Sequence, residues 1–263
     1  MQRRNKLIEK YISSQWGDFL ELALLEIDKA FRVYKLNSLT TERNRFNERK
    51  VIAPSESAHS AFAIVSIAIA LESFVSYRAF NERLDDFDSF QELALKLDKF
   101  NIHSTEILAA VRELTVCRDS IVHGHIWIKH RVSNNYTFKI EEIRSYLWSP
   151  FKNKRKKYIQ NVNWTKRETK DIKLKIIPLD VSYIDCVKAL KILTIIMEFI
   201  LESASIQWRP PIFPYERDGF SSETAQALRE QHHPSDWLSY YENNLIEVDK
   251  NKVIEIFNNI TTL

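Results

Sequence analysis

Residues 61–70 read AFAIVSIAIA and are the most apolar part of a longer helical pattern, which decides the fold. Ser55 and Ser57 precede this run and are residue types that commonly cap helix N-termini, so the sequence predicts a helix from Ser55 to about Asn81. Apolar residues occupy most sides of that helix, which places it at the centre of the fold. We expect the other elements to pack around it.

Apolar residues that recur every three or four positions predict further helices on both sides of this central one. These helices cover Gln15–Lys35, Phe87–Phe100, Ser104–His123 and Val181–Ala204, with Ser104 as an N-cap and Gly124 as a stop. Asn37–Lys50 lacks a period and is expected to be a loop. The chain of 263 residues therefore predicts a mainly α protein, a helical bundle.

A change of pattern predicts a small antiparallel β insertion between the last two core helices. Ile126–His130, Tyr136–Ile143 and Lys173–Ile177 alternate apolar and polar residues, with a turn at residues 133–135 between the first two. We expect one helical domain over residues 1–206, with the insertion at about 126–180. Residues 207–263 are expected to form a C-terminal tail with two or three short helices.

Composition excludes several classes of protein and of site. Three glycines cannot form the glycine-rich loops that bind nucleotide phosphates. The basic start of the chain is followed by no apolar segment, so no secretory signal is expected. The apolar stretches Ala61–Leu71 and Ile192–Leu201 are shorter than the ~20 residues that cross a bilayer. Cys117 and Cys186 are predicted to be buried thiols. The sequence predicts a cytoplasmic protein with no membrane partner.

Basic residues are concentrated in the second half of the insertion. Residues 151–175 contain ten basic and two acidic side chains, a net charge of +8, while the whole chain carries +3. Lysine and arginine neutralise phosphates, and the nearby Tyr158 and Trp164 could stack on unpaired bases. The alternative is a solvated loop whose lysines only keep the protein soluble. We expect RNA contacts from Lys152, Lys154, Arg155, Lys156, Lys157, Lys166 and Arg167.

Residues 118–125 read RDSIVHGH and combine two groups that suit chemistry on phosphates. Arg118 can bind a phosphate through two donors, and His123 at a helix C-terminus can transfer a proton. Such a pair is the minimum for cleavage of RNA without a metal. Spacing alone favours the simpler interpretation, in which His123 caps the helix and Arg118 forms a surface ion pair.

This segment resembles the R-x4-6-H signature of the HEPN domain family, in which a polar residue, here Asp119, commonly follows the arginine. Residues 70–77, ALESFVSY, resemble the second helix of many HEPN proteins, and Val181–Ala204 supplies the long helix that follows the signature. The resemblance covers the first helix to Trp127 together with that last helix. It leaves out the β insertion and the tail after Gln207.

The resemblance implies a helical homodimer in which two such segments face one cleft, without a cofactor or metal. Many HEPN proteins are metal-independent RNA endonucleases that act as toxins or in phage defence. Arg118 would stabilise the charged transition state, His123 would move a proton, and Asp119 would orient His123. His125 also fits the spacing and is a second candidate for proton transfer, and Glu72 would approach the cleft from the second helix.

One departure and three alternatives accompany this hypothesis. Where one HEPN subset has a tyrosine that a partner antitoxin modifies, this chain has His125 or Trp127, which puts that form of control in doubt. A zinc site from Cys117 and nearby histidines lacks the paired spacing of zinc motifs. A serine hydrolase lacks its G-x-S-x-G turn. The serious alternative is a non-catalytic HEPN module that binds RNA or a protein partner.

Overall fold

The computed structural model describes residues 2–39, 52–81, 93–123, 127–132, 137–142, 160–203 and 233–258. The helices in these ranges are α1 (Gln2–Leu39), α2 (Pro54–Asn81), α3 (Leu93–Asp98), α4 (Thr105–His123), α6 (Tyr183–Ser203), α8 (Pro234–Asn243) and α9 (Glu247–Phe257). The strands form two antiparallel pairs, β1 (Trp127–Val132) with β2 (Thr137–Glu142) and β3 (Val162–Asn163) with β4 (Glu168–Thr169). The prediction of a mainly α protein is confirmed.

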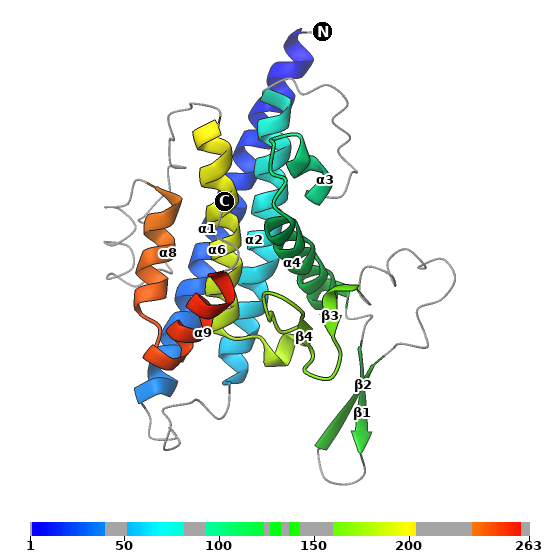
Figure 1. Ribbon diagram of the computed structural model, residues 1–263, viewed down its shortest axis with the longest axis vertical. Helices are drawn as coiled ribbons and strands as arrows, with labels where there is room; N and C mark the ends of the chain where they lie inside the picture. The colour runs from blue at the N-terminus through cyan, green and yellow to red at the C-terminus, as the bar shows by residue number, and fades with distance from the viewer. Residues whose placement is uncertain are drawn as a thin grey trace.

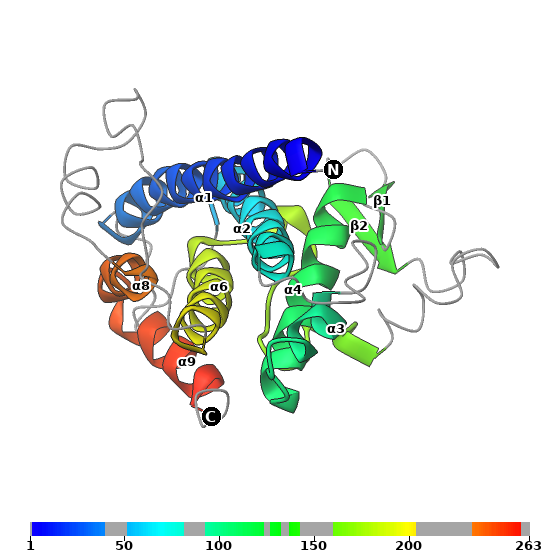
Figure 2. The same ribbon diagram turned by 90° about the horizontal axis from the view of Figure 1, so that it is seen from above.

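Helix α2 lies at the centre of the bundle, as its composition predicted. Figures 1 and 2 show α6 and α4 on opposite sides of α2, with α1 packed along a third side. Ile64, Ile67 and Leu71 of α2 are fully buried in the core that these helices share. The apolar character of α2 on most of its sides therefore follows from having neighbours in several directions.

By length and composition alone, the segment Pro54–Ala79 could also cross a membrane. In the structure, 61% of its most apolar window is buried inside the protein. The packing of α1, α4 and α6 around α2 accounts for that apolar composition without a lipid environment.

The cap of helix α2 lies two residues earlier than the sequence predicted. The N–H of Ser57 donates to the carbonyl of Ala53 at 3.0 Å, which makes Pro54 the first helical residue and Ala53 its cap. Proline is favoured there because its φ already suits a helix and its missing N–H has no partner to lose. The assignment of Ser55 as the N-cap is therefore wrong.

Helix α4 begins and ends as predicted. The hydroxyl of Ser104 accepts the N–H of Ile107 at 3.4 Å, and the Ser104 carbonyl accepts the N–H of Leu108 at 3.0 Å. Ser104 is thus the N-cap, and His123 is the last residue of the helix. Because α4 ends at His123 as predicted, Arg118 lies in the last turns of this helix.

The predicted hairpin is present, with Trp127 opposite Glu142 and Val132 opposite Thr137. It leaves the C-terminal end of α4 and extends away from the bundle (Figure 1). The third predicted strand, Lys173–Ile177, is wrong, because only a single bridge pairs Lys175 with Glu168. A positive φ of 59° at Lys173 interrupts the extended backbone there.

Residues 170–177, which we call the strap, are held on α4 by side chains that bind their backbone. Buried Glu113 accepts the N–H groups of Asp171 and Ile172, both at 2.7 Å. Ser120 Oγ donates to the Ile176 carbonyl at 2.5 Å. These contacts hold the strap on α4, and backbone bonds also join it to the β4 hairpin. The N–H of Thr169 donates to the Leu174 carbonyl at 2.8 Å, and the N–H of Ile176 donates to the Arg167 carbonyl at 3.2 Å.

The C-terminal helices pack against α1 and α6 rather than lying apart from them. The hydroxyl of Tyr34 on α1 donates to Asp249 Oδ2 on α9 at 3.0 Å, and Tyr183 of α6 donates to the carbonyl of Tyr241 on α8 at 2.8 Å. Trp237 and Phe257 complete the buried aromatic contacts of these two helices. The predicted boundary at residue 207 lies outside the described residues.

Candidate functional site

The candidate site is centred on Arg118, five residues before the end of α4. Its side chain keeps 26% of its surface exposed, so it lies at the surface between α4 and α2 rather than in the core. Its Nη2 is 3.7 Å from Glu72 Oε2 on α2, and its Nε is 3.0 Å from Asp119 Oδ1. The structure thus brings together one guanidinium and two carboxylates, with Glu72 approaching Arg118 from α2.

These two contacts hold the guanidinium loosely. The distance to Glu72 exceeds that of a hydrogen bond. The Arg118 Nε is buried and near Asp119, but among the described residues no acceptor is aligned with it as a hydrogen-bond partner. Arg118 is therefore paired by charge rather than fixed by directed bonds, and its donors can turn toward another anion.

The two candidate histidines are placed only in part. His123 ends α4, where the helix dipole favours a positive charge, and its side chain lies outside the described part of the structure. His125 also lies outside it. Their roles stay predictions, with His123 a turn and a half of helix beyond Arg118.

The β3–β4 hairpin lies beside the C-terminal half of α4 (Figure 1). Its Val162 and Trp164 pack with Val116 of α4, two residues before Arg118. Lys166 and Arg167 are exposed in the turn of this hairpin, and Arg167 has a positive φ of 54°. Two of the predicted RNA-binding residues are therefore carried by a hairpin that is fixed to the same part of α4 as Arg118.

The described part of residues 151–175, from 160 to 175, is folded onto the bundle, and the choice between RNA binding and solubility for its exposed lysines stays a prediction. Ile172 and Leu174 are fully buried, and Lys175 pairs with Glu168 at 2.7 Å. The remaining predicted RNA-binding residues lie outside the described part of the structure: Lys152, Lys154, Arg155, Lys156 and Lys157.

Glu113 is the residue of this region that the sequence did not reveal. Burial raises its pKa, and the hydrogen bonds from Ile172, Thr169 and Asp171 oppose that effect only in part. The sequence did contain one signal, a glutamate within an apolar helical pattern. Such a carboxylate is expected to be buried and therefore to need hydrogen-bond partners. Its partners come from a segment almost sixty residues away, which no local pattern identifies.

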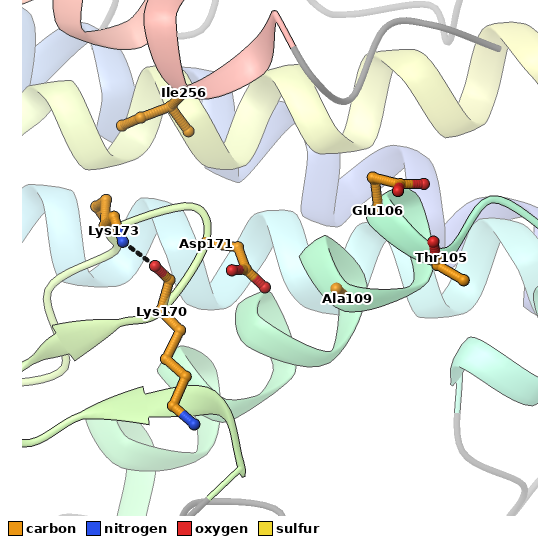
Figure 3. A pocket seen from close by; sticks show the side chains of 7 residues that line it. All are labelled: Thr105, Glu106, Ala109, Lys170, Asp171, Lys173 and Ile256. Carbon is orange, nitrogen blue, oxygen red and sulfur yellow. Dashed lines mark hydrogen bonds between the residues drawn. The ribbon is translucent and has the colours of Figure 1, made fainter.

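A cavity of about 420 Å³ opens at the other end of α4. Thr105, Glu106 and Ala109 line it from α4, Lys170, Asp171 and Lys173 from the strap, and Ile256 from α9 (Figure 3). Lys173 Nζ donates to the carbonyl of Lys170 at its edge. Nine residues separate Ala109 from Arg118, about 13 Å along a helix, so this cavity is separate from the candidate site.

Cys117 and Cys186 are buried free thiols, as predicted. Cys117 Sγ donates to the Lys175 carbonyl at 3.2 Å, and burial raises its pKa well above the usual value. A neutral thiol that already holds the strap backbone is a poor metal ligand. The described residues contain no group of three histidine, cysteine or acidic side chains that could hold a metal ion.

No protein-family model, curated protein or solved structure matches the chain.

Proposed function

We propose that the protein is a metal-independent RNA endonuclease of the HEPN type. The observation that carries the proposal is the placement of Arg118, partly exposed near the end of a helix that packs on α2 and ends at His123. The order of helices and the signature at residues 118–123 support the same family. A role in the cytoplasm as a bacterial toxin or phage-defence effector, with an antitoxin or a defence protein as a possible partner, belongs to this proposal.

The proposed reaction is transesterification of the RNA backbone. The 2′-oxygen attacks the adjacent phosphorus and loses its proton to a base, while the bond from phosphorus to the 5′-oxygen breaks and that oxygen gains a proton. The products are a 2′,3′-cyclic phosphate and a 5′-hydroxyl. His123, or alternatively His125, moves a proton, Arg118 stabilises the charge that develops on the phosphate, and Asp119 orients His123.

An apolar stripe beside the candidate site supports a homodimer. Phe62 of α2 is 65% exposed, and Val65 and Ile69 continue the same helix face toward Glu72. Val122, one turn beyond Arg118 on α4, is 52% exposed. Large apolar side chains gathered on one face are typical of an interface, and a second copy that covered them would bring two Arg118 side chains toward one cleft.

A non-catalytic module that binds RNA or a protein partner is the second candidate. The observation in its favour is that Glu72 and Asp119 already balance the charge of Arg118. A surface arginine with a purely structural role would have such partners. Both candidates share the fold and the dimer, and they differ in whether the protein breaks RNA.

The test is incubation of the purified protein with single-stranded RNA and with DNA of the same sequence in EDTA. We expect RNA cleavage to 2′,3′-cyclic phosphate ends and intact DNA. Arg118→Ala should lower the rate about 10²–10³-fold, because it removes a donor to the transition state. His123→Ala should cause a similar loss of rate, and His125→Ala tests the alternative base.

Arg112→Ala is the matched control, because Arg112 lies on α4 six residues before Arg118 and outside the proposed site. Its rate should stay at the wild-type value. Unchanged cleavage by both the Arg118 and the His123 variants would contradict the mechanism. Binding of RNA without any cleavage would instead support the non-catalytic module.

A further inference from the structure

The two carboxylates beside Arg118 differ in how firmly they are placed. Asp119 adjoins Arg118 in the chain, keeps 16% of its side chain exposed and lies 3.0 Å from Nε. Glu72 belongs to another helix, is 40% exposed and lies 3.7 Å from Nη2. Exposed ion pairs at such distances contribute little to stability, so the contact with Glu72 is the one that can be exchanged.

A phosphate can form stronger contacts with the guanidinium of Arg118 than Glu72 does. It can accept two parallel hydrogen bonds from one edge of an arginine, whereas the contact with Glu72 is a single ion pair beyond hydrogen-bond distance. Asp119 lies at Nε, which leaves the Nη2 side of the guanidinium for an incoming anion. Glu72 lies on that side.

We propose that Glu72 holds, in the free protein, the position beside Arg118 that an RNA phosphate takes on binding, so that RNA displaces it. This inference rests on the proposed binding of RNA at Arg118. A displaced Glu72 stays near the bound phosphate, since α2 is rigidly packed in the core. Its negative charge therefore weakens RNA binding twice, by competing for Arg118 and by repelling the phosphate.

Removing the charge of Glu72 should consequently tighten RNA binding. The experiment measures fluorescence anisotropy of a labelled single-stranded RNA with 2′-O-methyl groups, which binds but has no nucleophile for cleavage. We expect Glu72→Gln to bind it about three- to tenfold more tightly than the wild type at low salt. The gain should shrink as salt is added, because exposed charges are screened.

Two further variants separate this effect from a general change in charge. Glu255→Gln makes the same change at an exposed position of α9, and its affinity should stay within twofold of the wild type. In an Arg118→Ala background, Glu72→Gln should lose most of its gain, because the competition for the guanidinium is gone. Equal thermal unfolding midpoints would show that the variants remain folded.

Weaker or unchanged binding by Glu72→Gln, with RNA still bound by the wild type, overturns the exchange and makes Glu72 a structural partner of Arg118. The proposed RNA contact itself survives that outcome. If the wild type binds no RNA at any salt concentration, the proposed function is overturned, and with it the exchange of Glu72 for a phosphate. The two failures are therefore distinguishable.

Discussion

Replacement of Glu113 should detach the strap from α4. In the structure one carboxylate accepts two backbone N–H groups at 2.7 Å, one of them fully buried and the other partly buried. A buried donor left without an acceptor costs about 1–3 kcal/mol. Glu113→Ala should therefore lower the free energy of unfolding by about 2–5 kcal/mol. Glu113→Gln, which keeps one acceptor oxygen, should lower it by about 1–3 kcal/mol.

The assay is urea unfolding followed by tryptophan fluorescence, to which the buried Trp16 and Trp237 contribute. Glu202→Ala, at an exposed position of α6, is the control and should stay within about 0.5 kcal/mol of the wild type. Hydrogen exchange gives a local readout, because the amides of Asp171 and Ile172 should lose protection first. A loss below about 0.5 kcal/mol in Glu113→Ala would refute the role assigned to this carboxylate.

The pH dependence of the same variants follows from the raised pKa of Glu113. The folded protein binds this proton more tightly than the unfolded chain does, so the contribution of Glu113 is fully present below its unfolded pKa, about 4.5. It is lost as the pH rises through the folded pKa. The stability advantage of the wild type over Glu113→Gln should therefore shrink with rising pH, and an advantage that grows would contradict this account.

Three further predictions concern other parts of the protein. Phe62→Glu should convert a dimer into a monomer in light scattering, and an unchanged mass would exclude the stripe on α2 as the interface. Burial would raise the pKa of Glu26, but hydrogen bonds from Lys29 and His59 outweigh that effect and lower the pKa. The free energy of unfolding should therefore fall as the pH drops through the folded-state pKa of Glu26, and Glu26→Gln should reduce that fall. Replacement of Lys166 and Arg167 by alanine should reduce the salt slope of single-stranded RNA binding by about 1.4, and an unchanged slope would exclude the β3–β4 turn from the interface.

The helices were predictable because their signals are local. The apolar run of α2 and the Ser104 cap of α4 lie within the segments that they define, so both helices were found within a few residues of their observed bounds. The first helix was predicted too short, since α1 extends from Gln2 to Leu39. Its additional N-terminal turns lack the strong apolar stripe on which the prediction depended.

The strap could not be predicted from its own residues. Its alternating pattern indicated a strand, but its pairing with β4 is limited to one bridge, between Lys175 and Glu168. The rest of its attachment comes from the side chains of Glu113 and Ser120 on α4. Of the candidate site, the sequence placed Arg118 and Asp119 together on one helix, and only the HEPN resemblance pointed to Glu72 on another. The distances that make Glu72 the loosely held partner depend on how α2 and α4 pack, which no pattern within either helix specifies.

The bond between Tyr34 and Asp249 has a consequence for the synthesis of the protein. The two residues are 215 positions apart, and together with Tyr183 and Tyr241 they join the first helix of the structure to its last. Tyr183 of α6 packs on Phe31 and Tyr34 of α1, but while the ribosome is still making α8 and α9 the part of α1 that these two helices cover stays exposed. That exposed surface is prone to aggregate and to bind chaperones until α8 and α9 emerge. Completion of this bundle must therefore wait until α9 has been made.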